Sequence, residues 1–190
     1  NHPDHVCDLI PFLFGARYRP SARKKDLELV AGPGFSEFLD KLMQAFKHWL
    51  VPTDYQLNVT EIDEGLKKFG PHQVIFKKVQ HIAMSRGYRF ENHAGKSVVI
   101  SGDTDYCQGM IELGKEADLM ILECAMPDGE KIAGHLVPSL AAKLAQEARC
   151  KKLCLTHFYP PCDMDVIRKT VSTIYSGELF LAHDLMQFEI

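Results

Sequence analysis

The chain has 190 residues, of which 46% are hydrophobic and 25% are charged, and its formal net charge at pH 7 is -3. This length and balanced composition exclude collagen-like, low-complexity and mainly disordered chains. The slightly acidic charge excludes a protein that works by covering nucleic acid with positive charge, because that mode needs a large excess of lysine and arginine. We therefore expect one globular domain over residues 1–190.

The first half of the chain predicts helices and strands in mixed order. Residues 6–14 are largely apolar and end at Gly15, which favours a short buried helix. Residues 27–30 predict a strand, and the apolar spacing over 35–49 predicts an amphipathic helix. Alternating apolar and charged residues between positions 55 and 90 predict antiparallel strands.

The second half alternates short apolar runs with helical patterns. Strands are predicted at 98–100, 119–122 and 153–155, and the helices that follow them at 107–115, 138–148 and 163–175. This alternation is typical of parallel strands with helices packed on the sheet. Asp103, Glu123 and His157 follow the three strands. Because the carboxyl ends of parallel strands meet at one edge of a sheet, we expect the functional site there.

The six cysteines and the apolar runs bear on where the protein works. No two cysteines form a C-x-x-C pair, and Cys124 and Cys154 lie inside apolar runs, where a thiol behaves as a small hydrophobic side chain. Every apolar run is shorter than the roughly 18 residues that a membrane-spanning helix needs. We expect a reduced, cytoplasmic protein with no membrane partner.

Residues of the types that bind metals gather at the start of the chain and recur at three later points. Two imidazoles and a carboxylate within four residues suit zinc or iron better than magnesium or calcium. A solvated chain end is the alternative for this group, and a hydrogen-bonded core histidine is the alternative for each later histidine. The candidate ligands are His2, Asp4, His5, His81, Asp103 and His157.

The order of these residues resembles the metallo-β-lactamase superfamily, and in particular its ribonuclease Z and phosphodiesterase-like branch. That superfamily is marked by H-x-H-x-D-H, and residues 1–5 match the last five positions of this motif. Its later motifs are matched at residues 79–89, 101–104, 134–142 and 155–158. The resemblance covers essentially the whole chain and implies a mixed α/β (α+β) fold, the four-layer αββα sandwich.

The resemblance also implies a binuclear metal-dependent hydrolase with a metal-bridging hydroxide as the nucleophile. Asp103 would bridge two divalent ions, most readily zinc, with iron or manganese as alternatives. One ion would take His2, His81 and a histidine before Asn1, and the other would take Asp4, His5 and His157. Asp4 is implied as a catalytic residue as well as a ligand, and His135 as the proton donor to the leaving group, with a loop histidine as the alternative.

Several further residues are expected to support the metals or to contact the substrate. Thr104 and Glu123 are expected to orient metal-bound groups through hydrogen bonds. Tyr106 could reach a substrate oxygen, with packing as the alternative. Arg17 and Arg19 could bind a phosphate, although a solvated basic loop is the more common meaning of such a run.

The chain departs from the transfer-RNA-processing members of the branch in two places. The interval between His81 and Asp103 reads as two strands and a turn, too short for the extended arm that grips transfer RNA. Residues 159–162 stand where those enzymes tend to have an arginine-containing turn. We therefore expect a phosphodiesterase for a small-molecule or nucleotide-type phosphodiester. A hydrolase of a carboxylic ester, lactone or sulfate ester and a non-catalytic metal-binding module are the alternatives, and a homodimer is left open.

The beginning of the chain falls inside the first motif. The first histidine of H-x-H-x-D-H would come directly before Asn1. Members of the superfamily usually carry a β-rich segment ahead of this motif. We therefore expect the 190 residues to be an amino-terminally incomplete domain that lacks this β segment and is preceded by a histidine.

Overall fold

The structure, a computed structural model, describes residues 2–18 and 23–190. The chain forms two compact units, Asn1–Ile62 and Asp63–Ile190. Arg19, one of the predicted phosphate contacts, lies outside the described residues. In the described parts of the chain, no helix combines the length and the apolar character that crossing a bilayer requires.

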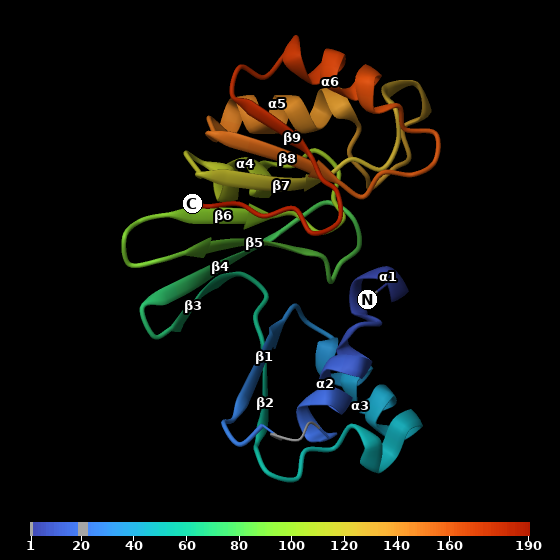
Figure 1. Ribbon diagram of the computed structural model, residues 1–190, viewed down its shortest axis with the longest axis vertical. Coiled ribbons are helices and arrows are strands. Elements are labelled where there is room, and N and C mark those ends of the chain that lie inside the picture. The colour runs from blue at the N-terminus through green and yellow to red at the C-terminus, as the bar shows by residue number, and fades with distance from the viewer. Residues whose placement is uncertain (1, 19–22) are drawn as a thin grey trace. The chain divides into compact units, whose positions relative to one another are not determined.

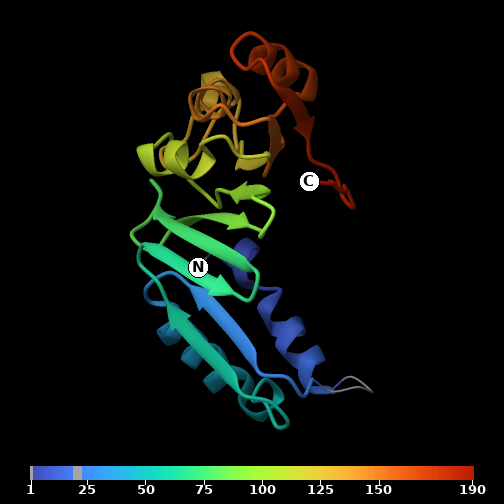
Figure 2. The same ribbon diagram turned by 90° about the vertical axis from the view of Figure 1, so that its left-hand side faces the viewer.

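The first unit folds around a small core between helices and a sheet. Among its described residues, its elements are α1 (Pro3–Val6), α2 (Leu9–Tyr18), β1 (Leu27–Ala31), α3 (Phe35–Phe46), the 3-10 helix η1 (Lys47–Trp49) and β2 (Leu57–Glu61). Leu13, Leu39 and Leu50 are buried at its centre, and apolar side chains of both strands pack against them. The strands β1 and β2 pair in parallel and lie side by side in Figure 2.

Two predictions for the first unit are wrong. The apolar segment 6–14 is not one buried helix that ends at Gly15, because α2 continues to Tyr18 and Phe12 is half exposed. A glycine inside a helix costs only about 1 kcal/mol relative to alanine, which neighbouring turns can offset. The strand β2, expected to pair antiparallel, pairs in parallel with β1, and α3 lies in the connection that such a pairing requires.

The second unit is built on one large sheet with helices packed against it (Figure 1). Its elements are β3 (Gly65–Phe69), β4 (His72–Lys78), β5 (Arg86–Glu91), β6 (Ser97–Ile100), α4 (Gln108–Gly114), β7 (Leu119–Glu123), the 3-10 helix η2 (Asp128–Glu130), α5 (Pro138–Ala148), β8 (Lys152–Thr156), α6 (Met164–Ser172) and β9 (Glu178–Leu181). The seven strands follow one another in chain order across the sheet. Pairing is antiparallel from β3 to β6 and parallel from β6 to β9. The alternation of strands and helices predicted for the second half is confirmed.

The main core lies between the sheet and the helices α4, α5 and α6. Val99, Met120 and Leu153 are in register across β6, β7 and β8, and all three are fully buried. They pack in one cluster with helix residues such as Met110 and Leu144. Each such side chain stabilises the fold by about 1.5–3 kcal/mol. The core therefore holds firmly the three strands whose carboxyl ends carry polar residues.

Gly109→Ala is expected to destabilise the second unit. Gly109 lies in α4 so close to β4 that a Cβ atom there would meet the carbonyl oxygen of Lys78 at 2.3 Å. Because that oxygen belongs to the backbone, the added methyl group should lower the free energy of unfolding by about 1–3 kcal/mol, measured by urea denaturation. Gly129→Ala is the matched control, since a Cβ there meets nothing within 4 Å. Equal stabilities of the two variants would contradict the close packing.

Candidate functional site

Polar side chains meet at the carboxyl ends of β6, β7 and β8. Asp103 follows β6 after a turn at Gly102, which has a φ of 58°, while Glu123 ends β7 and His157 follows β8 directly. The backbone N–H of Thr104 donates to Oε1 of Glu123 (3.0 Å), and Nε2 of His157 lies 3.7 Å from Oδ1 of Asp103. The structure thus brings these three strand ends together, as the sequence pattern predicts for parallel strands.

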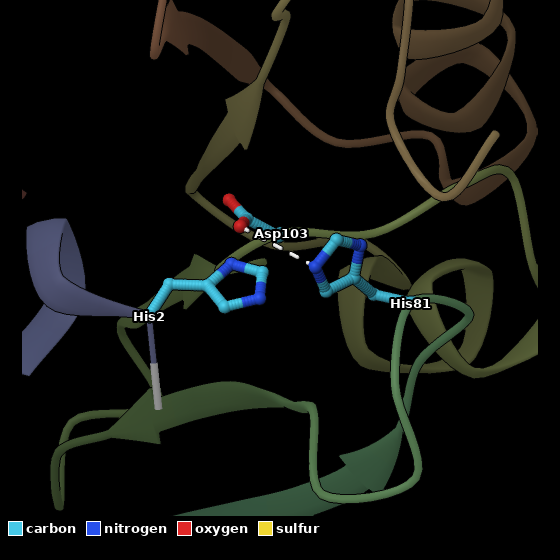
Figure 3. Close-up of side chains that lie close together, drawn as sticks. All are labelled: His2, His81 and Asp103. Carbon is cyan, nitrogen blue, oxygen red and sulfur yellow. Dashed lines mark ion pairs between the residues drawn. The ribbon is translucent and has the colours of Figure 1, made fainter. Parts of the chain in front are cut away.

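The carboxylate of Asp103 lies between two imidazole rings. Its Oδ2 atom is 3.6 Å from Nε2 of His81 (Figure 3), and its Oδ1 atom faces Nε2 of His157 at 3.7 Å. The Asp103 side chain is only 6% exposed. Each oxygen of one buried carboxylate therefore faces a different histidine, which is the arrangement a bridging ligand needs.

This donor set fits divalent metal. Imidazole nitrogens together with a carboxylate are the donors that zinc and related ions take in proteins. Atoms that each lie about 2 Å from one ion are separated by about 3–4 Å, and both nitrogen-to-oxygen distances around Asp103 fall in this range. Asp103, His135 and His157 also offer ligand atoms that all lie within 4.8 Å of one another.

Two contacts at Gln80 hold His81 beside the turn of Asp103. The backbone N–H of Gln80 donates to the hydroxyl of Thr104 (3.1 Å), and the carbonyl of Gln80 accepts from the N–H of Asp105 (2.7 Å). The hydroxyl of Thr104 therefore fixes the residue that precedes His81, while the predicted role of Thr104 in orienting metal-bound groups stays a prediction.

Gly134 sets the orientation of His81. Because a carbonyl oxygen only accepts, Nδ1 of His81 donates to the carbonyl of Gly134 (2.9 Å), which puts the lone pair on Nε2, the nitrogen that faces Asp103. Histidines that bind metals are commonly held by such a hydrogen bond. Gly134 has a φ of 85°, and a Cβ atom at this position would lie 2.8 Å from Nδ1 of His81. A larger residue would push the ring out of place.

Gly134→Ala is therefore expected to weaken metal binding about 10- to 100-fold, the loss typical when a group that orients a metal-binding histidine is disturbed. The affinity can be measured by competition with a chromophoric chelator. Gly95→Ala is the matched control, because Gly95 has a similar φ of 76° but nothing within 4 Å of an added Cβ atom. If Gly134→Ala bound metal as tightly as Gly95→Ala does, the contact between residue 134 and His81 would not matter for metal binding.

Asp105 ties the loop of His135 to the turn of Asp103. Its Oδ2 atom accepts from Nζ of Lys131 (2.5 Å) and from the N–H of Gly134 (3.2 Å). Burial acts to raise the pKa of Asp105, but the Lys131 ammonium and the backbone N–H donors hold it below its usual value. Sequence reasoning missed Asp105 and Gly134, although an acid two residues after Asp103 and a glycine directly before His135 were visible signals.

Glu123 holds the ring of His135. Its Oε1 atom shares a hydrogen bond with Nδ1 of His135 (2.8 Å), and its Oε2 atom accepts from the N–H of Ala125 (3.2 Å). Burial raises the pKa of Glu123 to about 7; the N–H of Thr104 opposes this rise and the negative charge of Asp103 adds to it. The hydrogen bond to this buried carboxyl fixes the orientation of the His135 ring.

The rings of His135, His157 and Tyr159 are neighbours at the end of β8. His135 stacks nearly parallel to His157, with ring centroids 5.9 Å apart, and it meets His81 edge-on at 4.8 Å. His157 has a φ of 63°, a left-handed conformation that costs a residue other than glycine about 1–2 kcal/mol. Such strained residues cluster at functional sites.

The predicted ligands His2, Asp4 and His5 lie in the first unit. His2 precedes α1, and Asp4 and His5 belong to this helix. Nε2 of His5 is 3.4 Å from Oδ2 of Asp4, and the rings of His2 and His5 are 6.4 Å apart. The three donor side chains are therefore close together at the start of the first unit.

Two of the predicted substrate contacts, Tyr106 and Arg17, have other partners in the structure. The hydroxyl of Tyr106 donates to Oε2 of Glu147 (2.6 Å), and Nζ of Lys143 lies over the Tyr106 ring at 5.0 Å. The Arg17 guanidinium donates to the carbonyl of Val51. Substrate contact by Tyr106, Arg17 and Arg19 stays a prediction.

The second unit thus has the architecture of an α/β protein with a histidine and carboxylate centre at its parallel strand ends. Residues 1–158 match the beta-lactamase superfamily domain, and the chain belongs to this superfamily. The resemblance predicted from the motifs is confirmed. Membership makes the protein a metallo-β-lactamase superfamily hydrolase, and the fold implies that it binds divalent metal.

Curated relatives and solved structures agree with this family. The chain is 29% identical over 184 residues to the probable metallo-hydrolase YhfI of Bacillus subtilis, covering 95% of this chain and 72% of YhfI. It is 27% identical over 213 residues to ribonuclease Z of Brevibacillus brevis, covering 84% of this chain and 66% of that protein. The chain therefore spans about two thirds of these relatives.

Two crystal structures show the same fold. YhfI superimposes with a TM-score of 0.79 at 26% identity, covering 96% of this chain and 71% of that one. The short form of human tRNase Z gives a TM-score of 0.73 at 25% identity, covering 97% and 74%. The predicted mixed α/β metallo-β-lactamase fold is confirmed.

Proposed function

We propose that the protein is a binuclear metal-dependent phosphodiesterase. The observation that carries this proposal is the buried carboxylate of Asp103, with one oxygen facing His81 and the other facing His157. Two divalent ions bound there would supply an activated water and would neutralise charge on the phosphoryl group under attack. Zinc is favoured by the nitrogen-rich donor set, with iron or manganese as alternatives.

The remaining ligands in this proposal come from the first unit. Three donor groups of the first unit match the H-x-H-x-D-H motif in sequence: His2, Asp4 and His5. His2 directly precedes α1, and Asp4 and His5 lie in this helix. In the proposed centre, His2 joins His81 at one ion and Asp4 and His5 join His157 at the other. Asp4 would also act in catalysis, as the superfamily motif implies.

His135 is the proton donor to the leaving group in the proposed reaction. Its Nδ1 atom is engaged by Glu123, so Nε2 is the atom from which a proton can pass to the departing oxygen. The buried Glu123 carboxyl keeps the ring in place and stabilises its charged form when ionised. The stacking of His135 on His157 keeps the donor next to the proposed ligands.

The substrate class in this proposal is a small-molecule or nucleotide-type phosphodiester. Support comes from the similarity to ribonuclease Z and from the pairing of a candidate two-ion centre with a positioned proton donor. A reduced, cytoplasmic setting is part of the proposal, because all six cysteines are free thiols.

Turnover of bis(p-nitrophenyl) phosphate tests the proposed function. The metal-loaded protein should release p-nitrophenolate, lose this activity to a chelator and regain it when zinc or manganese is added back. Turnover of p-nitrophenyl acetate without turnover of the phosphodiester would replace the phosphodiesterase with a carboxylic ester hydrolase. Metal binding with no turnover of either would indicate a non-catalytic module.

A further inference from the structure

We propose that Tyr159 forms a subsite for an aromatic group of the substrate, such as a nucleobase or an aryl ester. This inference rests on the proposed function, because it assigns the part of a phosphodiester that lies next to the reacting phosphorus. Tyr159 begins residues 159–162, which follow His157 and Phe158 in the sequence.

The Tyr159 ring lies beside the two histidines that the proposed reaction uses. Its centroid is 5.2 Å from that of His157 and 6.5 Å from that of His135, with tilts of 42° and 49°. The Tyr159 residue is 40% exposed, whereas the side chains of His157 and His135 are 18% and 12% exposed. Tyr159 is therefore the solvent-facing ring of this group of three.

The backbone holds Tyr159 in a fixed position. Its N–H donates to the carbonyl of Ala125 (3.1 Å), and its carbonyl accepts from the N–H of Cys162 (2.9 Å). The thiol of Cys162 reaches the same Ala125 carbonyl at 3.3 Å. Two prolines, Pro160 and Pro161, stiffen the turn between these contacts. A ligand that stacks on this ring would therefore bind with little loss of conformational entropy at Tyr159.

The chemistry of the proposed reaction places an ester group next to this ring. The phosphoryl group would lie at the centre that includes His157, and the departing oxygen would lie at His135. The ester group on this oxygen would then extend past the rings of His157 and His135 toward the more exposed ring of Tyr159. An aromatic side chain offers a flat apolar face on which a base or aryl ring stacks, and such contacts strengthen binding by about tenfold or more. The ring position therefore favours planar aromatic esters over saturated ones.

Two phosphate monoesters of equal charge and similar size test this preference. The zinc-loaded protein is titrated calorimetrically with phenyl phosphate and with cyclohexyl phosphate, and no turnover is needed. Wild type and Tyr159→Phe should bind phenyl phosphate about tenfold more tightly than cyclohexyl phosphate, whereas Tyr159→Leu should bind the two equally. Phe90→Leu is the matched control, since Phe90 is 41% exposed in β5 and the preference should survive there.

The inference is overturned if Tyr159→Leu keeps the preference, or if wild type binds both esters equally or neither. Nuclear Overhauser contacts between the phenyl protons and the Tyr159 ring of the wild-type protein give a second readout that does not depend on a variant. Their absence at saturating phenyl phosphate would also overturn it. If the protein does not hydrolyse bis(p-nitrophenyl) phosphate but still prefers phenyl phosphate, the proposed function is wrong and the aromatic subsite is supported.

Discussion

Asp103→Ala is expected to lose bound metal and hydrolytic activity together. The Asp103 carboxylate faces His81 with one oxygen and His157 with the other, so alanine would remove a ligand from both proposed ions at once. Mutating a group that only orients a metal ligand typically lowers activity by up to about 100-fold. Because Asp103 is itself a proposed ligand, kcat/KM should fall by more than this. Elemental analysis by mass spectrometry would show metal falling below one ion per chain.

Asp118→Ala is the matched control for this experiment. Asp118 is also a buried carboxylate, but it lies just before β7 begins, where it accepts from the N–H of Ser97 and pairs with Lys151. Its loss should lower stability while metal stays bound. The bridging role would be contradicted by an Asp103→Ala protein that keeps two ions, or by an Asp118→Ala protein that loses metal to the same extent.

His135→Ala should keep its metals and lose turnover. A positioned proton donor contributes about 10²–10⁴-fold to a rate, and the benefit is larger when the leaving group is a stronger base. The variant should therefore lose about 10²–10⁴-fold in kcat on a phosphodiester with an alkoxide leaving group. It should lose much less on bis(p-nitrophenyl) phosphate, because p-nitrophenolate departs without help.

The comparison of leaving groups separates proton donation from a general structural role. A structural defect would slow both substrates by the same factor, and so would the loss of a metal ligand. His72→Ala serves as the control, because His72 is an exposed histidine of β4. Full turnover by His135→Ala on the alkoxide substrate would remove His135 from the mechanism.

The second half of the fold was predictable because its pattern is local. Short apolar strands alternate with helices there, and Pro138 stands at the first position of α5, which begins and ends where the pattern places it. The first unit was less predictable. The pairing partner of β2 lies across α3, and nothing in the alternation of residues 57–61 distinguishes a parallel from an antiparallel neighbour.

The grouping of candidate residues was predictable where chain order and motif spacing carry the information. His81, Asp103 and His157 were named from the motifs, and the structure brings these three together. Gly134 and Asp105 were missed, because their roles come from a backbone carbonyl and from hydrogen bonds between two loops. Such contacts leave no periodic pattern in a sequence.

Anomalous diffraction from crystals of the zinc-loaded protein would test the central claim most directly. We expect two zinc peaks flanking the carboxylate of Asp103, one about 2.0–2.1 Å from Nε2 of His81 and the other at a similar distance from Nε2 of His157. Zinc peaks elsewhere on the protein with none at Asp103, or a single peak in contact with only one oxygen of Asp103, would contradict a binuclear centre bridged by this residue.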